Sequence, residues 1–201
     1  MKEGNRLLGG ELLKILAIGD LHIPSRANKV PDKLAEGLKR EFDVVAATGD
    51  YTTREVLSWI CSLGKKCIAV RGNMDYITDL PTYGKFTVGE LEVGVYHGTG
   101  VHPRGNPAQL SAIAKRIGVA ILITGHTHKQ EDLLYEGVLI VNPGSATGVW
   151  GGSASYSIPS FTVIEICEGE VVLEHIRLEE ELTTEIKVYE LSARGSRGYG
   201  P

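Results

Sequence analysis

The sequence contains no long apolar segment. The longest run without a polar residue or glycine is the five-residue stretch Val119–Ile123, whereas a membrane-spanning helix needs about 20 apolar residues. Residues 1–10 also contain no apolar core of the length found in signal peptides. We therefore expect a protein without a membrane span.

Cysteine is also scarce. The three cysteines, Cys61, Cys67 and Cys167, form no Cys-x-x-Cys pair and cannot all be bonded to one another within one chain. Unbonded thiols are typical of a reducing compartment. The cysteine pattern therefore predicts reduced thiols and a cytoplasmic location.

Positive charge is not in excess either. The chain has 21 Lys and Arg against 25 Asp and Glu, a formal charge of −4, which argues against general binding to nucleic acid. Apolar residues make up 42% and charged residues 23%, which is typical of a globular protein and excludes wholesale disorder. The length of 201 residues suits one domain. We expect that domain to span residues 1–191, followed by a flexible tail at 192–201.

The first half of the chain alternates short apolar runs with helical patterns. The runs that predict strands are Lys14–Ile18, Asp43–Ala47 and Lys66–Val70. Between them, Pro31–Phe42 predicts one helix and Thr52–Leu63 another, with Gly64 as the C-cap of the second. This βαβαβ order predicts a parallel sheet with covering helices.

The second half has the pattern of antiparallel hairpins. Three pairs of strand-like segments flank Gly–Glu or Glu–Gly turns: Lys85–Val88 with Leu91–Tyr96, Asp132–Tyr135 with Val138–Val141, and Phe161–Cys167 with Val171–Leu178. Asn106-Pro107 predicts the start of a helix that runs to Ile117 and is closed by Gly118. Further strands are predicted at Val119–Thr124 and Thr184–Leu191, and residues 147–160, rich in Gly and Ser, predict a long loop.

Metal-ligand residue types follow five of the predicted strands, each beside a glycine. In chain order they are Asp20 with His22, Asp50, Asn73, His97, and His126 with His128. Ligands of open α/β sheets gather at the carboxyl ends of the strands, so we expect Asp20, Asp50 and Asn73 to lie along one edge. The neighbouring glycines allow sharp turns and close approach of the backbone.

Each of these motifs alone has a commonplace interpretation. Gly-Asp is usually a turn, Asp-x-His can be an Asx-turn beside a surface histidine, and a single His97 can be a hydrogen-bonded core residue. Their regular order at strand ends favours a metal site instead. His102 and His175 lie outside the series, and we interpret both as structural or surface residues.

The donor set indicates two metal ions. Seven donors exceed the four ligands of a closed structural zinc site, and they suffice for two divalent ions that share a bridging carboxylate. Such an ion pair is suited to the hydrolysis of phosphate esters. Imidazole, carboxylate and amide ligands accept Mn, Ni, Zn or Fe, so the sequence does not choose among these metals.

The order of these motifs along the chain resembles the ligand series of the calcineurin-like metallophosphoesterases. The series is Asp-x-His, Gly-Asp, Gly-Asn, His and Gly-His-x-His. The resemblance extends from about Lys14 to Leu178, and the chain is similar to the small archaeal and bacterial phosphodiesterases. Gly19–Pro24, Gly125–Lys129 and Ile140–Gly148 are also similar to the small retromer subunit of vacuolar sorting. The resemblance implies an α/β (α+β) fold, a four-layer sandwich of two mixed β-sheets flanked by helices.

The resemblance also implies roles for the seven residues. Asp20, His22, Asp50 and His128 would hold the first metal. Asp50, Asn73, His97 and His126 would hold the second, with Asp50 bridging the two ions. The implied reaction is attack of a metal-bound hydroxide on a small phosphodiester, with Asp50, Asn73 and His97 as the catalytic residues.

Two positions depart from the family pattern. Met74 follows Gly72-Asn73, where many relatives carry a histidine that is proposed to protonate the leaving group. Thr99 stands where relatives often have the second histidine of His-Gly-His. General acid catalysis typically contributes about 10²–10⁴-fold, so we expect faster hydrolysis of activated aryl diesters than of alkyl esters.

Two other functions compete with the phosphodiesterase. The retromer likeness suggests a scaffold that docks protein partners, such as a helical-repeat protein, with little or no catalysis. A phosphomonoesterase is a weaker alternative, because Met74 cannot protonate a poor leaving group. Relatives of this size are often dimers, so a homodimer is also an expectation, by analogy only.

Overall fold

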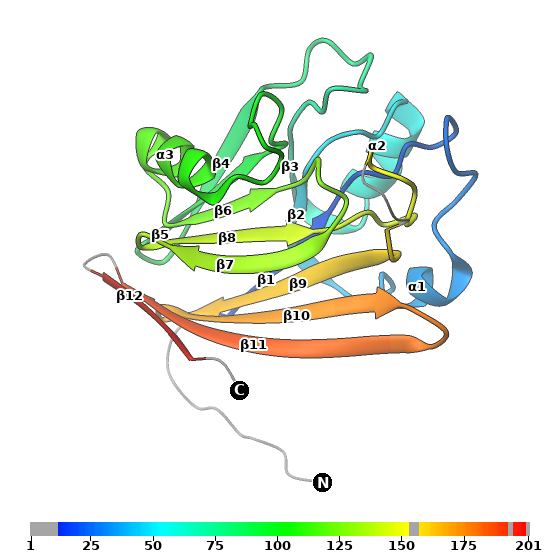
Figure 1. Ribbon diagram of the computed structural model, residues 1–201. Helices are drawn as coiled ribbons and strands as arrows, with labels where there is room; N and C mark the ends of the chain where they lie inside the picture. The colour runs from blue at the N-terminus through cyan, green and yellow to red at the C-terminus, as the bar shows by residue number, and fades with distance from the viewer. Residues whose placement is uncertain (1–11, 153–156, 193–194, 200–201) are drawn as a thin grey trace, which may run out of the picture.

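The parallel start of the chain builds one edge of a seven-stranded sheet (Figure 1). The computed structural model describes residues 12–152, 157–192 and 195–199. Its first elements are β1 (Leu13–Ile18), α1 (Asp32–Glu36), β2 (Phe42–Ala47), α2 (Arg54–Cys61) and β3 (Gly64–Ala69). Strand β1 pairs with β2, and β2 with β3, in parallel. The predicted βαβαβ unit is therefore confirmed.

The end of the chain completes this sheet with antiparallel strands. They are β9 (Ser160–Cys167), β10 (Glu170–Leu178), β11 (Leu182–Ser192) and β12 (Gly195–Tyr199), in the sheet order β12-β11-β10-β9-β1-β2-β3. The sequence assigned residues from 192 onward to a tail, but residues 195–199 pair with β11. The glycines and the charge of this segment hid its strand pattern.

The middle of the chain forms a second, five-stranded sheet. Its strands are β4 (Tyr83–Val88), β5 (Leu91–Tyr96), β6 (Ile121–Thr124), β7 (Gln130–Tyr135) and β8 (Val138–Pro143), in the order β4-β5-β6-β8-β7. The β4–β5 and β7–β8 pairs are antiparallel, as predicted, whereas β5–β6 and β6–β8 are parallel. Both sheets are therefore mixed.

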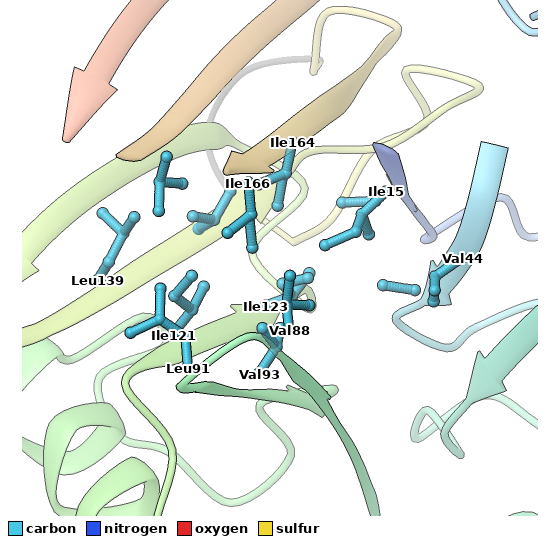
Figure 2. Close-up of a cluster of buried hydrophobic side chains, with 14 of the residues drawn as sticks. Ile15, Val44, Val88, Leu91, Val93, Ile121, Ile123, Leu139, Ile164 and Ile166 are labelled. Atoms are coloured by element: carbon cyan, nitrogen blue, oxygen red, sulfur yellow. The ribbon is translucent and has the colours of Figure 1, made fainter. Parts of the chain in front are cut away.

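Alternate residues of each strand face opposite layers. Ile15 and Ala17 point into the core between the sheets, where they meet Val93 and Ile123 of the second sheet. Figure 2 shows these facing rows of aliphatic side chains. Leu16 on the other face of β1 belongs to a separate apolar cluster. This period of two follows from the pleat of a strand.

Helices cover the two outer faces. Leu34 of α1 and Ile60 of α2 pack in the outer cluster of the seven-stranded sheet. Leu110 and Ala114 of α3 (Pro107–Ile117) pack with Leu122 on the outer face of the five-stranded sheet. The order helix, sheet, sheet, helix is the four-layer sandwich implied by the resemblance.

The helix boundaries agree with the sequence only in part. Helix α3 begins after the Asn106 cap, whose Oδ1 accepts from the Gln109 N–H at 3.0 Å, and it ends at Gly118 with φ 73°. Helix α1 is much shorter than the predicted Pro31–Phe42, because Gly37 lies against the Phe161 ring and Phe42 already belongs to β2. Helix α2 is shorter than Thr52–Leu63, and Gly64 begins β3.

The prediction of three reduced cysteines is wrong for two of them. Cys61 at the end of α2 and Cys67 in β3 form a disulfide. The tight connection between α2 and β3 brings their Cα atoms to 5.1 Å, within the usual range for a disulfide. The argument for a reducing, cytoplasmic location therefore loses its basis. Among the described residues, no helix is long and apolar enough to cross a membrane.

Candidate metal centre

All seven predicted ligands converge at the ends of β1, β2, β3, β5 and β6. Six of the side chains are buried, and Asn73 alone of the seven is exposed. The six buried residues are Asp20, His22, Asp50, His97, His126 and His128. We call these six residues and Asn73 the metal-ligand cluster. Its exposed member, Asn73, marks the side on which the cluster reaches the surface.

One half of the metal-ligand cluster is a compact group of four. Ligand atoms of Asp20, His22, Asp50 and His128 all lie within 4.8 Å of one another. The Nε2 atoms of His22 and His128 are 3.1 Å apart, and Asp20 Oδ1 is 3.6 Å from His128 Nε2. Four donors aimed at one point match the first ligand group implied by the resemblance.

The other half meets the first at Asp50. Asp50 Oδ2 lies 3.3 Å from His22 Nε2 and 3.6 Å from His97 Nε2. His97 Nε2 is also 3.1 Å from Asn73 Oδ1, and the rings of His97 and His126 lie with their centroids 5.0 Å apart. A single carboxylate oxygen therefore stands between two sets of donors.

The backbone that carries the metal-ligand cluster is strained. Among the described residues, eight other than glycine have positive φ, and five of these are in the cluster: Asp20, His22, Asp50, His126 and His128, at 50–72°. Each such residue costs about 1–3 kcal/mol and persists only where the surroundings enforce it. Strain of this kind is concentrated at functional sites.

Asp75 enforces the conformation around Asp50. Its carboxylate accepts hydrogen bonds from the backbone N–H groups of Gly72, Asp50, Tyr51 and Thr52, at 2.7–2.9 Å. No role was assigned to Asp75 from the sequence alone. Its place two residues after Asn73 does not by itself indicate that its carboxylate binds the backbone of another loop.

The loop that carries His126 and His128 is held by Asn142 of β8. The Asn142 amide donates to Gly125 O at 3.0 Å and to Thr127 Oγ1 at 2.9 Å. The hydroxyl of Ser145 donates to Asp20 O at 2.7 Å. The residues after β8 therefore brace the first and last ligand loops together.

Backbone carbonyls orient two of the histidines. His97 Nδ1 lies 2.8 Å from Thr48 O, and His128 Nδ1 lies 2.8 Å from Val149 O. A proton on each Nδ1 leaves Nε2 as the acceptor atom, which is the usual arrangement of metal-binding histidines. Both Nε2 atoms face the cluster.

The electrostatics of the cluster favour neutral side chains when no cation is bound. Burial, reinforced by the Asp50 carboxylate, raises the pKa of Asp20 well above its ordinary value. Burial also raises the pKa of Asp50, although His97 opposes this shift. Burial lowers the pKa of His22 to about 3 and the pKa values of His126 and His128 to about 4. A divalent cation would reverse the penalty on the carboxylates.

The residues fit a divalent metal. Within the described part of the chain, the buried Asp20 Oδ1 has no hydrogen-bond partner and lies 3.6 Å from His128 Nε2. An unmatched buried carboxylate oxygen beside imidazole nitrogens calls for a partner, and a cation can supply it. Neutral imidazoles and carboxylates are also the protonation states in which these groups bind metals.

His175, which the sequence set aside, belongs to a different polar group. Its Nδ1 is 2.9 Å from Thr162 Oγ1 and its Nε2 is 2.8 Å from Asp132 Oδ1. Lys187 and Tyr189 donate to the same carboxylate. This His175 cluster (Asp132, Thr162, His175, Lys187 and Tyr189) joins β7 of one sheet to β9, β10 and β11 of the other. His102 is exposed, so both histidines are structural or surface residues, as predicted.

Fold and site together define a metal-binding protein with a four-layer sandwich. The family model of the calcineurin-like phosphoesterase superfamily domain matches residues 13–169 of this chain. The chain is 37% identical to a probable metallophosphoesterase of Methanocaldococcus jannaschii over 141 aligned residues. The aligned region covers 70% of this chain and 71% of that protein. The chain therefore belongs to the calcineurin-like phosphoesterase superfamily.

Solved structures of Vps29, a retromer subunit, are also similar to this chain. A single mutant of Vps29 from Entamoeba histolytica gives a TM-score of 0.83 at 29% identity, covering 89% of this chain and 100% of that chain. Wild-type Vps29 from the same organism, complexed with Zn²⁺, gives a TM-score of 0.81 at 29% identity, covering 88% and 99%. The fold is thus shared with Vps29.

Proposed function

We propose that this chain is a phosphodiesterase that depends on two divalent metal ions. The observation that carries the proposal is the position of Asp50 Oδ2, 3.3 Å from His22 Nε2 and 3.6 Å from His97 Nε2. A carboxylate between two groups of nitrogen and oxygen donors is suited to bridging two ions. The Zn²⁺ complex of the similar Vps29 supports metal binding by a chain of this fold.

The ligand assignment follows from the two halves of the cluster. Asp20, His22, Asp50 and His128 would hold one ion, and Asp50, Asn73, His97 and His126 the other, with Mn, Ni, Zn or Fe compatible with this set. Bound there, the ions would lower the pKa of a coordinated water and offset the charge of the phosphate.

The protein side chains have separate tasks. Asp75 holds the Asp50 loop, and the carbonyls of Thr48 and Val149 hold the rings of His97 and His128. The exposed amide of Asn73 is placed to contact a phosphate oxygen of the substrate. Asp50, Asn73 and His97, which meet at the junction of the two halves, are the residues proposed to act in catalysis.

We favour a diester with a good leaving group. Met74 donates its backbone N–H to Asp50 Oδ1 at 2.8 Å, but its thioether has no proton to give to a leaving oxygen. Acid catalysis by a side chain contributes about 10²–10⁴-fold where it operates. Aryl phosphodiesters need it least, and alkyl monoesters need it most.

Metal-stripped protein with Mn²⁺, Ni²⁺, Zn²⁺ or Mg²⁺ added back tests the proposal. The substrates are bis-p-nitrophenyl phosphate and p-nitrophenyl phosphate. We expect metal-dependent hydrolysis of the diester in preference to the monoester. The exposed surface variant Asp32→Asn should behave like the wild type. Faster monoester hydrolysis would favour a phosphomonoesterase and contradict the diester assignment.

A scaffold function is the second candidate, and the similarity to Vps29 over most of both chains favours it. It implies partner binding, for which a helical-repeat protein is the expectation from the resemblance, with little or no catalysis. Binding of two ions without turnover of either ester would favour this candidate. Sedimentation of the purified chain would test the separate expectation of a homodimer.

A further inference from the structure

A large cavity opens beside the metal-ligand cluster. Its volume is about 810 Å³, and His128 forms part of its wall. This volume lies within the range of small-molecule sites, about 300–1,000 Å³. A substrate whose phosphorus is held at the metal-ligand cluster can therefore place one of its ester groups in this cavity.

Glycines keep the cavity open next to His128. A Cβ atom at Gly151 would lie 2.6 Å from the His128 ring, and one at Gly152 would lie 3.1 Å from an Nη atom of Arg104. Gly152 also has φ +97°, a conformation that glycine adopts readily. Backbone rather than side chains thus forms this wall.

The cavity is basic although the chain carries a net charge of −4. Its described lining residues include three cationic side chains, Arg104, Lys129 and Arg177, and one acidic side chain, Glu131. No aromatic side chain is among its described lining residues. A ligand would be recognised mainly by its negative charge.

The three cations differ in how firmly they are engaged. Arg177 is fixed, because its Nε donates to Gln130 Oε1 at 2.5 Å and its Nη2 to Glu185 at 2.8 Å. Lys129 pairs with Glu131 at 2.8 Å, but both side chains are well exposed, and such pairs contribute only about 0–1 kcal/mol.

Arg104 is the cation best placed to receive a ligand. One Nη atom donates to the Gly151 carbonyl, which orients the guanidinium at the cavity wall. Among the described residues, no carboxylate lies within ion-pair distance of Arg104. An oriented guanidinium without a carboxylate partner suits a phosphate group, which it can contact through two N–H groups.

We propose that this cavity binds a phosphate monoester carried on one arm of the phosphodiester, with Arg104 as its main contact and Lys129 as a second. The preferred substrate is thus a diester with a further terminal phosphate. This inference rests on the proposed function for the identity of the reacting group. The anion site itself is defined by the cavity and its charges.

Binding measurements separate the anion site from catalysis. Calorimetry would compare thymidine 3′,5′-bisphosphate with thymidine 5′-monophosphate on the same metal-loaded protein. We expect the bisphosphate to bind at least about tenfold more tightly. Arg104→Gln should remove most of this difference, and Lys129→Gln should reduce it. Arg116→Gln, which makes the same charge change on the exposed end of α3, should leave it intact.

Two binding results would overturn the inference. One is equal affinity of the wild type for both ligands. The other is an equal loss in Arg104→Gln and Arg116→Gln, which would mean that only net charge matters.

A kinetic arm tests the link to the reaction. The p-nitrophenyl ester of thymidine 5′-phosphate is compared with and without a 3′-phosphate. The 3′-phosphate should raise kcat/KM through KM, and Arg104→Gln should abolish the gain. If the protein binds the bisphosphate preferentially but hydrolyses neither ester, the anion site is supported and the proposed phosphodiesterase function is contradicted. If the protein hydrolyses both esters with equal kcat/KM, the phosphodiesterase function is supported and the proposed anion site is contradicted.

Discussion

The metal-ligand cluster and the His175 cluster contain the same kinds of buried side chain, yet they differ in how those side chains are satisfied. In the His175 cluster, both nitrogens of His175 have partners, and Asp132 accepts from His175, Lys187 and Tyr189. In the metal-ligand cluster, Asp20 Oδ1 and His22 Nδ1 have none. Buried histidine and aspartate alone therefore do not mark a site; an unsatisfied carboxylate oxygen that faces converging imidazole nitrogens does.

The carboxyl groups of the two clusters show the same contrast. Burial favours a neutral Asp132, but hydrogen bonds from His175, Lys187 and Tyr189 more than offset this and lower its pKa. Burial raises the pKa of Asp50 because its neighbours do not offset the loss of water. The fold therefore stabilises the carboxylate of Asp132 and disfavours the carboxylate of Asp50.

The largest expected difference is between Asp50→Asn and Asp132→Asn. We expect Asp50→Asn to lower metal-dependent hydrolysis by about 10³-fold or more, because the shared carboxylate is lost. Its metal-free stability should not fall, since burial disfavours the Asp50 carboxylate.

Asp132→Asn should do the opposite. It should keep hydrolysis while losing about 3–5 kcal/mol of stability, because a buried charge network is broken. Turnover of bis-p-nitrophenyl phosphate and urea unfolding measure the two effects. The contrast between the clusters would be refuted by a hydrolytically active Asp50→Asn variant.

Gly72→Ala should disturb the metal-ligand cluster with a single methyl group. The added Cβ would lie 2.1 Å from Asp50 Oδ1, so we expect a loss of about 1–3 kcal/mol from overpacking and a lower rate of hydrolysis. Gly137→Ala is the control, because Gly137 in the β7–β8 turn has open space around its Cα. That control should lose stability through its positive φ but keep its rate. Equal rates in both variants would contradict the expected role of Asp50.

Added metal ions should stabilise the protein through the metal-ligand cluster and not through the His175 cluster. At a free ion concentration of 100 times Kd, a single bound ion adds about 2.7 kcal/mol to the unfolding free energy. We expect His128→Gln to lose most of this gain, and Lys187→Met in the His175 cluster to keep it. Thermal unfolding with and without Mn²⁺ or Zn²⁺ gives the comparison. Full stabilisation of His128→Gln would argue against His128 as a ligand.

The pH dependence of the metal-free protein should carry the smallest signal. Burial lowers the pKa of His128 to about 4, whereas an unfolded chain has a histidine pKa near 6.5. Between these values the unfolded state binds the proton more readily, so His128 lowers stability as the pH falls from 6.5 to 4. The effect is at most about 1.4 kcal/mol per pH unit.

His128→Gln should remove that contribution. Urea unfolding in the presence of a chelator should therefore show a shallower pH dependence for the variant than for the wild type over this range. Equal slopes would mean that the His128 environment does not disfavour its charged form.

Much of the site could be predicted from the sequence because its signals are local. The apolar runs before Asp20, Asp50 and His126 predict strands, and the adjacent glycines predict turns at the strand ends. Parallel order then brings Asp20 and Asp50 to one edge of the seven-stranded sheet, whereas His126 follows β6 of the other sheet and reaches the cluster through the packing of the two sheets. The sequence also set His175 apart correctly, since it lies inside a strand pattern instead of at a strand end.

What the sequence missed depends on tertiary contacts. The carboxylate of Asp75 is bonded to backbone groups of two loops, 3–25 positions away, and no local pattern reports such bonds. The early end of α1 reflects the close contact of Gly37 with Phe161. The Cys61–Cys67 disulfide requires the end of α2 to fold onto β3. The first two features depend on segments that are distant in the sequence, and the disulfide depends on the geometry of the tight α2–β3 connection.

The central claim is that Asp50 is shared by two metal ions that hydrolyse a phosphodiester. The most direct measurement is the titration of metal-free protein with Mn²⁺, with bound ions and bis-p-nitrophenyl phosphate hydrolysis followed together. The account predicts that hydrolysis rises and saturates at two bound ions per chain, and that Asp50→Asn reaches neither value. Two bound ions without hydrolysis would contradict it.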